Sequence, residues 1–101
     1  MQQEDFAVWV ASGMLVRAAL RAPGTPTGWL ASPKDPMAQT WKVSFTSKTG
    51  EHQVVYADVD VDLTKPPPQV QLTPQGKGRE LSADERVLAR DRDIVSTGKE
   101  W

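Results

Sequence analysis

Two stretches in the middle of the chain alternate between apolar and polar residues. In residues 41–46, Trp, Val and Phe alternate with Lys, Ser and Thr, and in residues 55–63, Val, Ala and Leu alternate with Tyr and Asp. A period of two is typical of strands with one buried face. Ser47–Glu51 suits a three-residue hairpin loop with Gly50 in the left-handed region. This loop pairs Ser47 with Glu51 and therefore Trp41 with Ala57, which puts the odd positions of both strands on one face.

A third strand is predicted for residues 69–73, which alternate again after the three prolines of residues 66–68. Proline cannot sit inside a sheet ladder, so the three prolines mark a loop. Pairing Leu63 with Val70 keeps the apolar residues together. The region 41–73 therefore predicts a three-stranded antiparallel meander with residues 55–63 in its centre.

An apolar helix is predicted for residues 5–22. Glu4 and Asp5 lie where the helix dipole favours acids, and Arg17 and Arg21 lie where it favours bases. Ala-Pro-Gly at residues 22–24 ends the helix. Its polar positions form one narrow stripe, so most of its circumference needs cover from another element or from a partner chain.

A second, amphipathic helix is predicted for residues 82–96. Ser82 caps it, and Glu85 three residues later completes a capping box. Residues 23–40, with four prolines and two glycines, predict a long loop in which Trp29 packs against the core. This loop is interpreted as packed coil or as a binding loop.

These elements predict one α+β domain over residues 1–101. In it the N-terminal helix packs on a three-stranded antiparallel meander, and an amphipathic helix follows at the C-terminus. The composition, 39% hydrophobic and 25% charged, is typical of a soluble globular chain. The net charge of -1 disfavours a nucleic-acid partner. The absence of cysteine excludes disulfides, cysteine-based zinc and iron–sulfur sites, and a cysteine nucleophile.

The apolar stretch from Phe6 to Leu20 predicts neither a signal peptide nor a membrane span. It follows Glu4 and Asp5 where a signal peptide carries positive charge, and it contains Arg17. It is also shorter than the roughly 20 residues that span a bilayer. We therefore expect no membrane contact and a cytoplasmic location, with the mature domain of an exported protein as the alternative.

Three aspartates at alternate positions, Asp58, Asp60 and Asp62, are the most conspicuous polar feature. On a strand they share one face, about 6.6 Å apart. An EF-hand loop needs Gly and Glu where this chain has Leu63 and Gln69, so a calcium loop is excluded. The remaining interpretations are a solvated strand face, a docking surface for a basic partner and, least favoured, a metal site.

The other candidates are His52 and the four tryptophans. His52 lies at the hairpin end, opposite Thr46, where a hydrolase would need a nucleophile and an acid within reach. No nucleophile-elbow or phosphate-loop pattern accompanies it. We expect Trp29 to pack under the loop, Trp9 to lie near the polar stripe of the first helix, and Trp101 to lack cover within its own chain.

These observations predict a small non-catalytic interaction module without cofactor or metal, such as an adaptor, inhibitor or assembly component. It would act through the apolar helix, by self-association or with a protein partner, and through an acidic sheet face. The expected surface residues are Trp9, Trp29, Tyr56, Asp58, Asp60, Asp62 and Trp101. The alternative is a ligand-binding domain with a pocket between helix and sheet, gated by the Trp29 loop.

Overall fold

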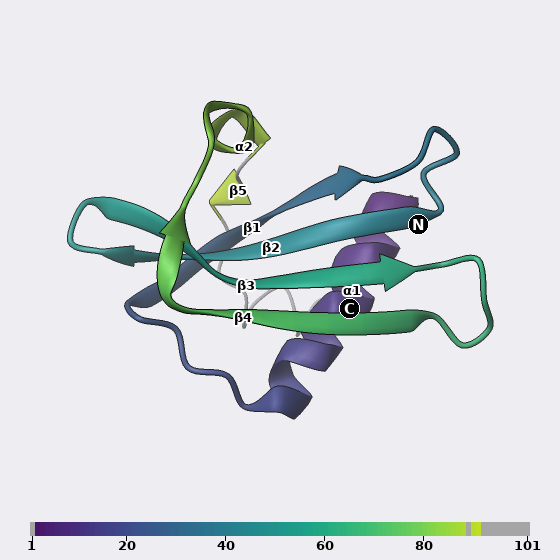
Figure 1. Cartoon of the computed structure of the whole chain (residues 1–101), viewed down its shortest axis with the longest axis horizontal. Helices are drawn as coiled ribbons and strands as arrows, with labels where there is room; N and C mark the ends of the chain where they lie inside the picture. Colours follow the sequence, from purple (N-terminus) through teal and green to yellow (C-terminus); the bar gives the residue numbers. More distant parts are fainter. Residues whose placement is uncertain (1, 89, 92–101) are drawn as a thin grey trace.

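A helix crosses one face of an antiparallel sheet in the computed structural model, which describes residues 2–88 and the backbone of residues 90–91 (Figure 1). The sheet order is β4-β3-β2-β1-β5. The elements are α1 (Gln3–Ala18), β1 (Thr25–Pro33), β2 (Thr40–Thr49), β3 (His52–Asp62), β4 (Gln69–Glu80), α2 (Ala83–Leu88) and β5 (Arg90–Asp91). The α+β class and the N-terminal helix packed on an antiparallel sheet are confirmed, but the sheet has more than three strands.

α1 is shorter than the predicted helix. It carries Glu4 and Asp5 in its first turn and Arg17 in its last, as the helix dipole favours. It ends because Ala19 turns into the left-handed region (φ 52°) and donates its N–H to the Val16 carbonyl. Residues 19–24 then connect α1 to β1, so the predicted helix end at residue 22 is wrong.

The predicted loop 23–40 is wrong, because its central residues form β1. Trp29 and Ala31 pack with the core on the α1 side, whereas Leu30 faces Val55 and Leu81 on the other side. A strand buried on both faces shows no alternation, which hides it from pattern analysis. β1 pairs with β2 along its length and with β5 only at Gly28 and Trp29, so its prolines are tolerated.

The β2–β3 hairpin forms as predicted, but its register differs. Thr49 pairs with His52 across a two-residue turn, and Gly50 has the predicted positive φ (66°). A β-bulge follows, in which Phe45 pairs with Ala57 and Thr46 with Val55. Trp41 therefore pairs with Val61, not with Ala57. Beyond the bulge odd positions still meet odd positions, so the predicted buried face is preserved.

The bulge changes the position of Tyr56, the extra residue of β3. An extra residue shifts the alternation of side chains by one place. Tyr56 therefore belongs to the same buried cluster as Ala57, on the α1 side, and is 4% exposed. The prediction that Tyr56 lies on the outer sheet face is wrong.

Burial gives Tyr56 a measurable signature, because it is the only tyrosine in the chain. Burial raises its pKa to about 12. We expect its absorbance change on ionisation to occur near pH 12 in the folded protein and near 10 in urea. The unfolded state then loses its proton first, so stability from this group is lost as pH rises through 10 towards 12. A transition near pH 10 in the folded protein would contradict the burial.

β4 continues well past the predicted third strand. Val61 pairs with Val70 and Val59 with Leu72, which shifts the predicted register by two and leaves the faces unchanged. Residues 75–78 bulge out of the ladder between Pro74 and Arg79. Gly78 has φ 100°, and a Cβ there would lie 2.5 Å from Val54, so this position requires glycine. After the bulge β4 rises over the outer face towards α2 (Figure 1).

The predicted capping box at the start of α2 is confirmed. The Glu85 amide donates to the Ser82 hydroxyl at 3.2 Å, and the Ser82 amide donates to the Glu85 carboxylate at 2.9 Å. The predicted helix 82–96 is too long, because α2 ends at Leu88 and residues 90–91 pair with β1. Residues 92–96 of that prediction lie outside the described part of the chain.

The main core lies between α1 and the sheet. It joins Ala7, Val8, Ala11 and Leu15 of α1 to side chains of β1, β2 and β3. Phe45, Val43 and Val59 are fully buried within it. Among the described residues, no helix has both the length and the hydropathy that crossing a membrane requires.

Candidate functional site

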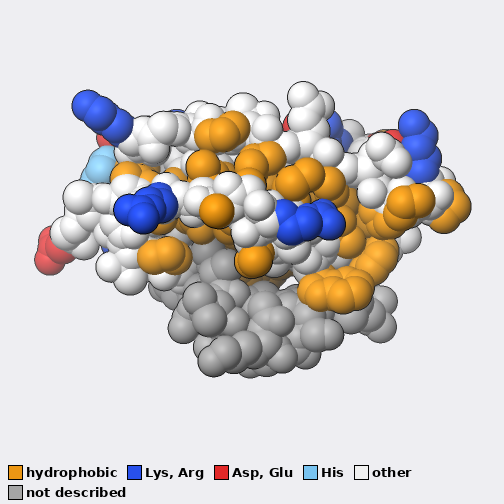
Figure 2. Space-filling model, turned by 90° about the horizontal axis from the view of Figure 1, so that it is seen from below, with side chains coloured by type: hydrophobic (Ala, Val, Ile, Leu, Met, Phe, Trp, Pro, Cys, Tyr) orange, Lys and Arg blue, Asp and Glu red, His pale blue; other side chains and the backbone are white. Residues whose placement is uncertain are grey.

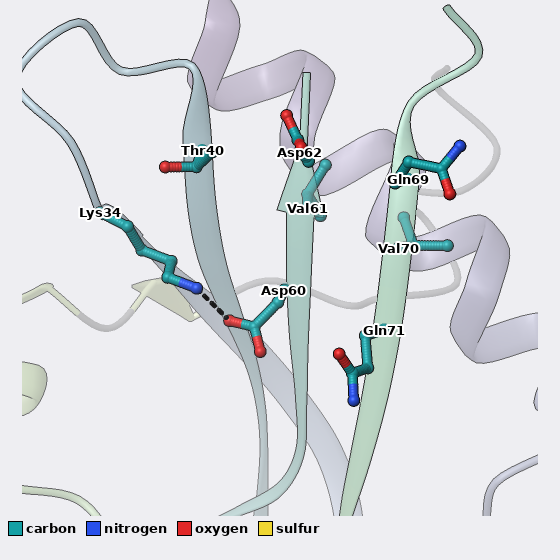
Figure 3. Close-up of a pocket in the computed structure, with 8 residues that line it drawn as sticks. All are labelled: Lys34, Thr40, Asp60, Val61, Asp62, Gln69, Val70 and Gln71. Carbon is teal, nitrogen blue, oxygen red and sulfur yellow. Dashed lines mark hydrogen bonds and ion pairs between the residues drawn. The ribbon is translucent and has the colours of Figure 1, made fainter. Parts of the chain in front are cut away.

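A polar groove of about 340 Å³ lies on the outer face of the sheet, where neither α2 nor the curled end of β4 covers it. In Figure 3, α1 passes behind the strands and the polar side chains lie on the near side. We call this site the polar groove. Its lining residues are Lys34, Thr40, Asp60, Val61, Asp62, Gln69, Val70 and Gln71.

The sheet register brings the polar lining residues together. Asp62 stands opposite both Thr40 of β2 and Gln69 of β4, and Asp60 stands opposite Gln71. Directly opposite residues share a face of a sheet. One side chain comes from outside the three strands: the Lys34 ammonium lies 3.2 Å from an Asp60 oxygen (Figure 3).

The turn between β1 and β2 positions Lys34 and Thr40. The Asp35 carboxylate accepts hydrogen bonds from the amides of Met37, Gln39 and Thr40 and from the Thr40 hydroxyl. These bonds, chiefly the one from the Thr40 hydroxyl, hold the pKa of Asp35 below its usual value. Asp35 therefore remains an anion that fixes the wall of the polar groove.

The two groove carboxylates remain near the surface. The Asp60 side chain is 43% exposed and the Lys34 side chain 50%, so water screens their ion pair. Asp62 accepts hydrogen bonds from the hydroxyl and the amide of Thr64, and these bonds lower its pKa. With one lysine and two aspartates, the lining has a net charge of -1. It presents carboxylate, amide and hydroxyl groups to an incoming molecule.

Asp58 does not belong to this exposed set, which corrects the prediction of three solvated aspartates. It is 5% exposed. Arg79 donates to its two oxygens through Nε at 3.1 Å and Nη2 at 3.0 Å, and Gln75 donates at 2.8 Å. Ser44 also donates to Asp58 through a short hydrogen bond. The curled end of β4 thus supplies the arginine that neutralises a buried carboxylate.

The same arginine reaches α2. Arg79 donates through Nη1 and Nη2 to the two oxygens of Glu85, each at 2.8 Å. We call Ser44, Asp58, Gln75, Arg79 and Glu85 the Arg79 cluster. It links β2, β3, β4 and α2. Each of its charged groups is held by its neighbours, so we assign it to stability rather than to binding.

The electrostatics of the Arg79 cluster favour the charged forms of its acids. Burial raises the pKa of Asp58, but the hydrogen bonds from Arg79 and Ser44 and the charge of Arg79 outweigh burial and lower it. The hydrogen bond from Arg79 is the main reason that the pKa of Glu85 falls to about 2. Both carboxylates are therefore ionised at neutral pH and pair with the arginine.

The predicted tryptophan sites are scattered. Trp29 is buried in β1 on the α1 side, and Trp9 is 43% exposed on α1, where its ring lies 5.8 Å from that of Phe6. Trp101 lies outside the described residues. The predicted surface residues Trp9, Trp29, Tyr56, Asp58, Asp60 and Asp62 therefore do not form one site, and only Asp60 and Asp62 line the polar groove.

His52 stands opposite Thr49, not Thr46, and its Nε2 lies 3.3 Å from a Glu80 oxygen. Both side chains are more than half exposed. Ser44 and Asp58 are hydrogen-bonded within the Arg79 cluster, and His52 pairs with Glu80. Within the described residues, no group of three or more acidic or histidine side chains is arranged to hold a metal ion.

The alternative pocket between helix and sheet loses its proposed gate, because the residues around Trp29 form β1. Trp41 and Phe45 are buried in the main core, whereas Trp9 lies outside it. The polar groove is on the opposite face of the sheet.

The polar groove continues to a sheet edge. Among the described residues, no strand pairs with the outer edge of β4. On the α1 side of this edge, Val70 and Leu72 of β4 and Val10 of α1 are partly buried at the margin of the core. The view from below shows hydrophobic side chains interspersed with lysine and arginine side chains (Figure 2). β4 thus contributes polar side chains to the polar groove on one face and the partly buried Val70 and Leu72 on the other.

Comparison of the chain with models of protein families, with curated proteins and with solved structures finds no match.

Proposed function

We propose that the chain is a small non-catalytic module that binds an extended, basic segment of a protein partner at the polar groove and the adjoining edge of β4. The observation that carries this proposal is the combination, at one place, of surface carboxylates and a strand edge with which no described strand pairs. Asp60 and Asp62 lie on the uncovered half of the outer face, beside the regular part of β4.

The edge of β4 suits the main chain of such a segment. Residues 69–73 are regularly paired with β3, so their other backbone groups point outward in a strand pattern. Adding a strand to an open edge is a common way to bind an extended peptide. Alternate side chains of the added strand would then face the polar groove on one side and Val70 and Leu72 on the other.

The charge of the polar groove favours basic side chains over acidic ones. The pKa values of Asp62 and of nearby Asp35 are lowered, so both are anions at neutral pH. Lys34 already pairs with Asp60, but this pair is exposed to water. Replacing it by a pair between Asp60 and an incoming basic side chain therefore costs little free energy. Within the lining, an incoming lysine or arginine would meet two aspartates and one lysine. Lys42 of β2, opposite Asp60, and Lys65, near Asp62, flank these carboxylates.

A direct test uses the pentapeptide acetyl-Lys-Val-Lys-Val-Lys-amide in an NMR titration of the folded protein. We expect amide shifts at residues 69–73 and at Asp60 and Asp62, and an affinity that falls as salt rises. The double variant Asp60→Asn, Asp62→Asn should weaken binding by roughly tenfold, about 1.4 kcal/mol. The matched variant Asp84→Asn, on exposed α2, should bind like the wild type.

Two results would contradict the proposal. One is equal binding of the acidic peptide acetyl-Glu-Val-Glu-Val-Glu-amide, since this outcome removes the role of the carboxylates. The other is a set of shifts away from β4 and the polar groove.

A further inference from the structure

α1 carries a second apolar stripe on the side away from the sheet. The buried residues of the helix, Ala7, Val8, Ala11, Ser12 and Leu15, face the sheet. Phe6, Trp9, Gly13 and Val16 follow one another at spacings of three, four and three, and so form a continuous stripe on the opposite side. We call these four residues the exposed stripe. Val16 is 76% exposed and Trp9 43%.

We propose that the exposed stripe binds the same stripe of a second copy of this chain, with the two α1 helices antiparallel about a two-fold axis. The proposal goes beyond the function proposed above and does not depend on it. A two-fold interface brings the same patch of both copies together, so the patch must complement itself.

The exposed stripe is self-complementary in size. In the antiparallel register that sets Trp9 against Gly13 of the second copy, Phe6 comes opposite Val16. Each large side chain then meets a small one. A Cβ added at Gly13 would meet nothing within 4 Å, so the surface beside Gly13 is open and nothing in the described chain fills it. An indole ring from the second copy would occupy that space.

The charges at the two ends of α1 favour the antiparallel arrangement. Glu4 and Asp5 lie in the first turn and Arg17 in the last. In this register Asp5 of one copy lies level with Arg17 of the other, so each acidic end is next to a basic end. The two helix dipoles are also opposed, which favours antiparallel pairing. A parallel pair would instead put like charges side by side.

The dimer would leave the polar groove accessible. α1 covers one face of the sheet and the polar groove opens on the other, so the two grooves would face away from the two-fold axis (Figures 1 and 3). A failure of peptide binding and a failure of dimerisation are therefore separate results.

Sedimentation velocity at micromolar concentration tests the proposal on the full chain. We expect the wild type to sediment as a dimer, at twice the 11.1 kDa chain mass. Val16→Asp and Gly13→Gln should each raise the dimer dissociation constant at least tenfold. Gly13→Gln is the more specific test, because glutamine favours the helix more than glycine does. Its side chain nevertheless occupies the space proposed for Trp9 of the second copy.

A matched control is Val87→Asp on α2, where the valine is 80% exposed and outside the exposed stripe. This variant should remain dimeric. A wild-type monomer would overturn the proposal, and so would a dimer that survives both Val16→Asp and Gly13→Gln. Circular dichroism of each variant checks that a loss of dimer is not a loss of fold.

The antiparallel arrangement has its own readout, because the chain has no cysteine. A spin label on Gln3→Cys, an exposed position in the first turn, would be the only label on each copy. The proposed register separates the two labels by about 24 Å along the helix axes. A parallel pair would bring them within about 10 Å, and that distance would overturn the arrangement.

Discussion

Arg79→Met is expected to lower the free energy of unfolding by about 3–5 kcal/mol at pH 7, because it leaves the Asp58 carboxylate buried without its counter-charge. Asp58 is 5% exposed and receives two of its hydrogen bonds from Arg79. Methionine retains much of the volume of the arginine stem, so the loss measures charge more than packing. Urea unfolding monitored by tryptophan fluorescence gives the value.

The pH dependence separates a charge effect from a packing effect. In the wild type the pKa values of Asp58 and Glu85 are lowered, so their contribution is present above pH 4 and is lost as pH falls through the folded values. In Arg79→Met the hydrogen bonds and the charge of Arg79 no longer offset the burial of Asp58, and only the weaker support from Ser44 and Gln75 remains, so the pKa of Asp58 should rise. The variant therefore gains stability on acidification while the wild type loses it. The difference between the two should be much smaller at pH 4 than at pH 7.

The control is Arg86→Met, an exposed arginine on α2 whose side chain is outside the Arg79 cluster. It should change stability by no more than about 0.5 kcal/mol. A loss in Arg79→Met that is the same at pH 7 and pH 4 would show that the arginine stabilises the fold through packing and not by neutralising Asp58.

Tyr56→Ala is the second large effect, with an expected loss of about 3–5 kcal/mol in the free energy of unfolding. The ring lies in the core between α1 and the sheet, so its removal leaves a cavity as well as losing apolar burial. Thermal unfolding by calorimetry, together with urea unfolding, would measure the loss.

Tyr56→Phe is the matched variant, because it keeps the ring and removes only the hydroxyl. It should cost less than about 1.5 kcal/mol. If Tyr56→Ala proved as mild as Tyr56→Phe, the side chain would lie on the outer face, as a regular strand without the bulge would place it.

Much of the fold follows from local patterns in the sequence. The alternation around Trp41 and Val59 identified two strands and their buried face, Gly50 marked the turn, and Ser82 with Glu85 marked the start of α2. Each signal involves residues within a few positions of one another. The long connection inferred for residues 23–40 was itself evidence of a missing element, because compact domains seldom contain one of that length.

The features that sequence analysis missed depend on contacts between distant residues. β1 has no alternating pattern, because Leu30, on the outer face, is also buried, against Val55 and Leu81. The bulge that turns Tyr56 inward has no glycine or proline within β2 or β3 to mark it. For β1 and for the bulge at Tyr56, tertiary packing and not the local sequence pattern determines the structure.

The candidate site was predicted in part. The aspartates at positions 60 and 62 remain on the outer face, and the suggestion of a basic partner rests on them. Their neighbour Asp58 is buried because Arg79, which is 21 residues away in sequence, folds back over it. Lys34 and Thr40 enter the polar groove only because Asp35 shapes the turn before β2. No spacing in the sequence indicates either contact.

The double role of Glu85 implies an order of assembly during folding. A helix of six residues is too short to persist alone in water, so α2 depends on its contacts. The carboxylate that caps α2 also binds Arg79, and Arg79 is in place only after β4 has passed its bulge and reached Asp58. The β2–β3 hairpin, whose contacts are the most local, is therefore expected to nucleate folding, and α2 to form last. The end of β4 and α2 would then unfold together as one cooperative unit.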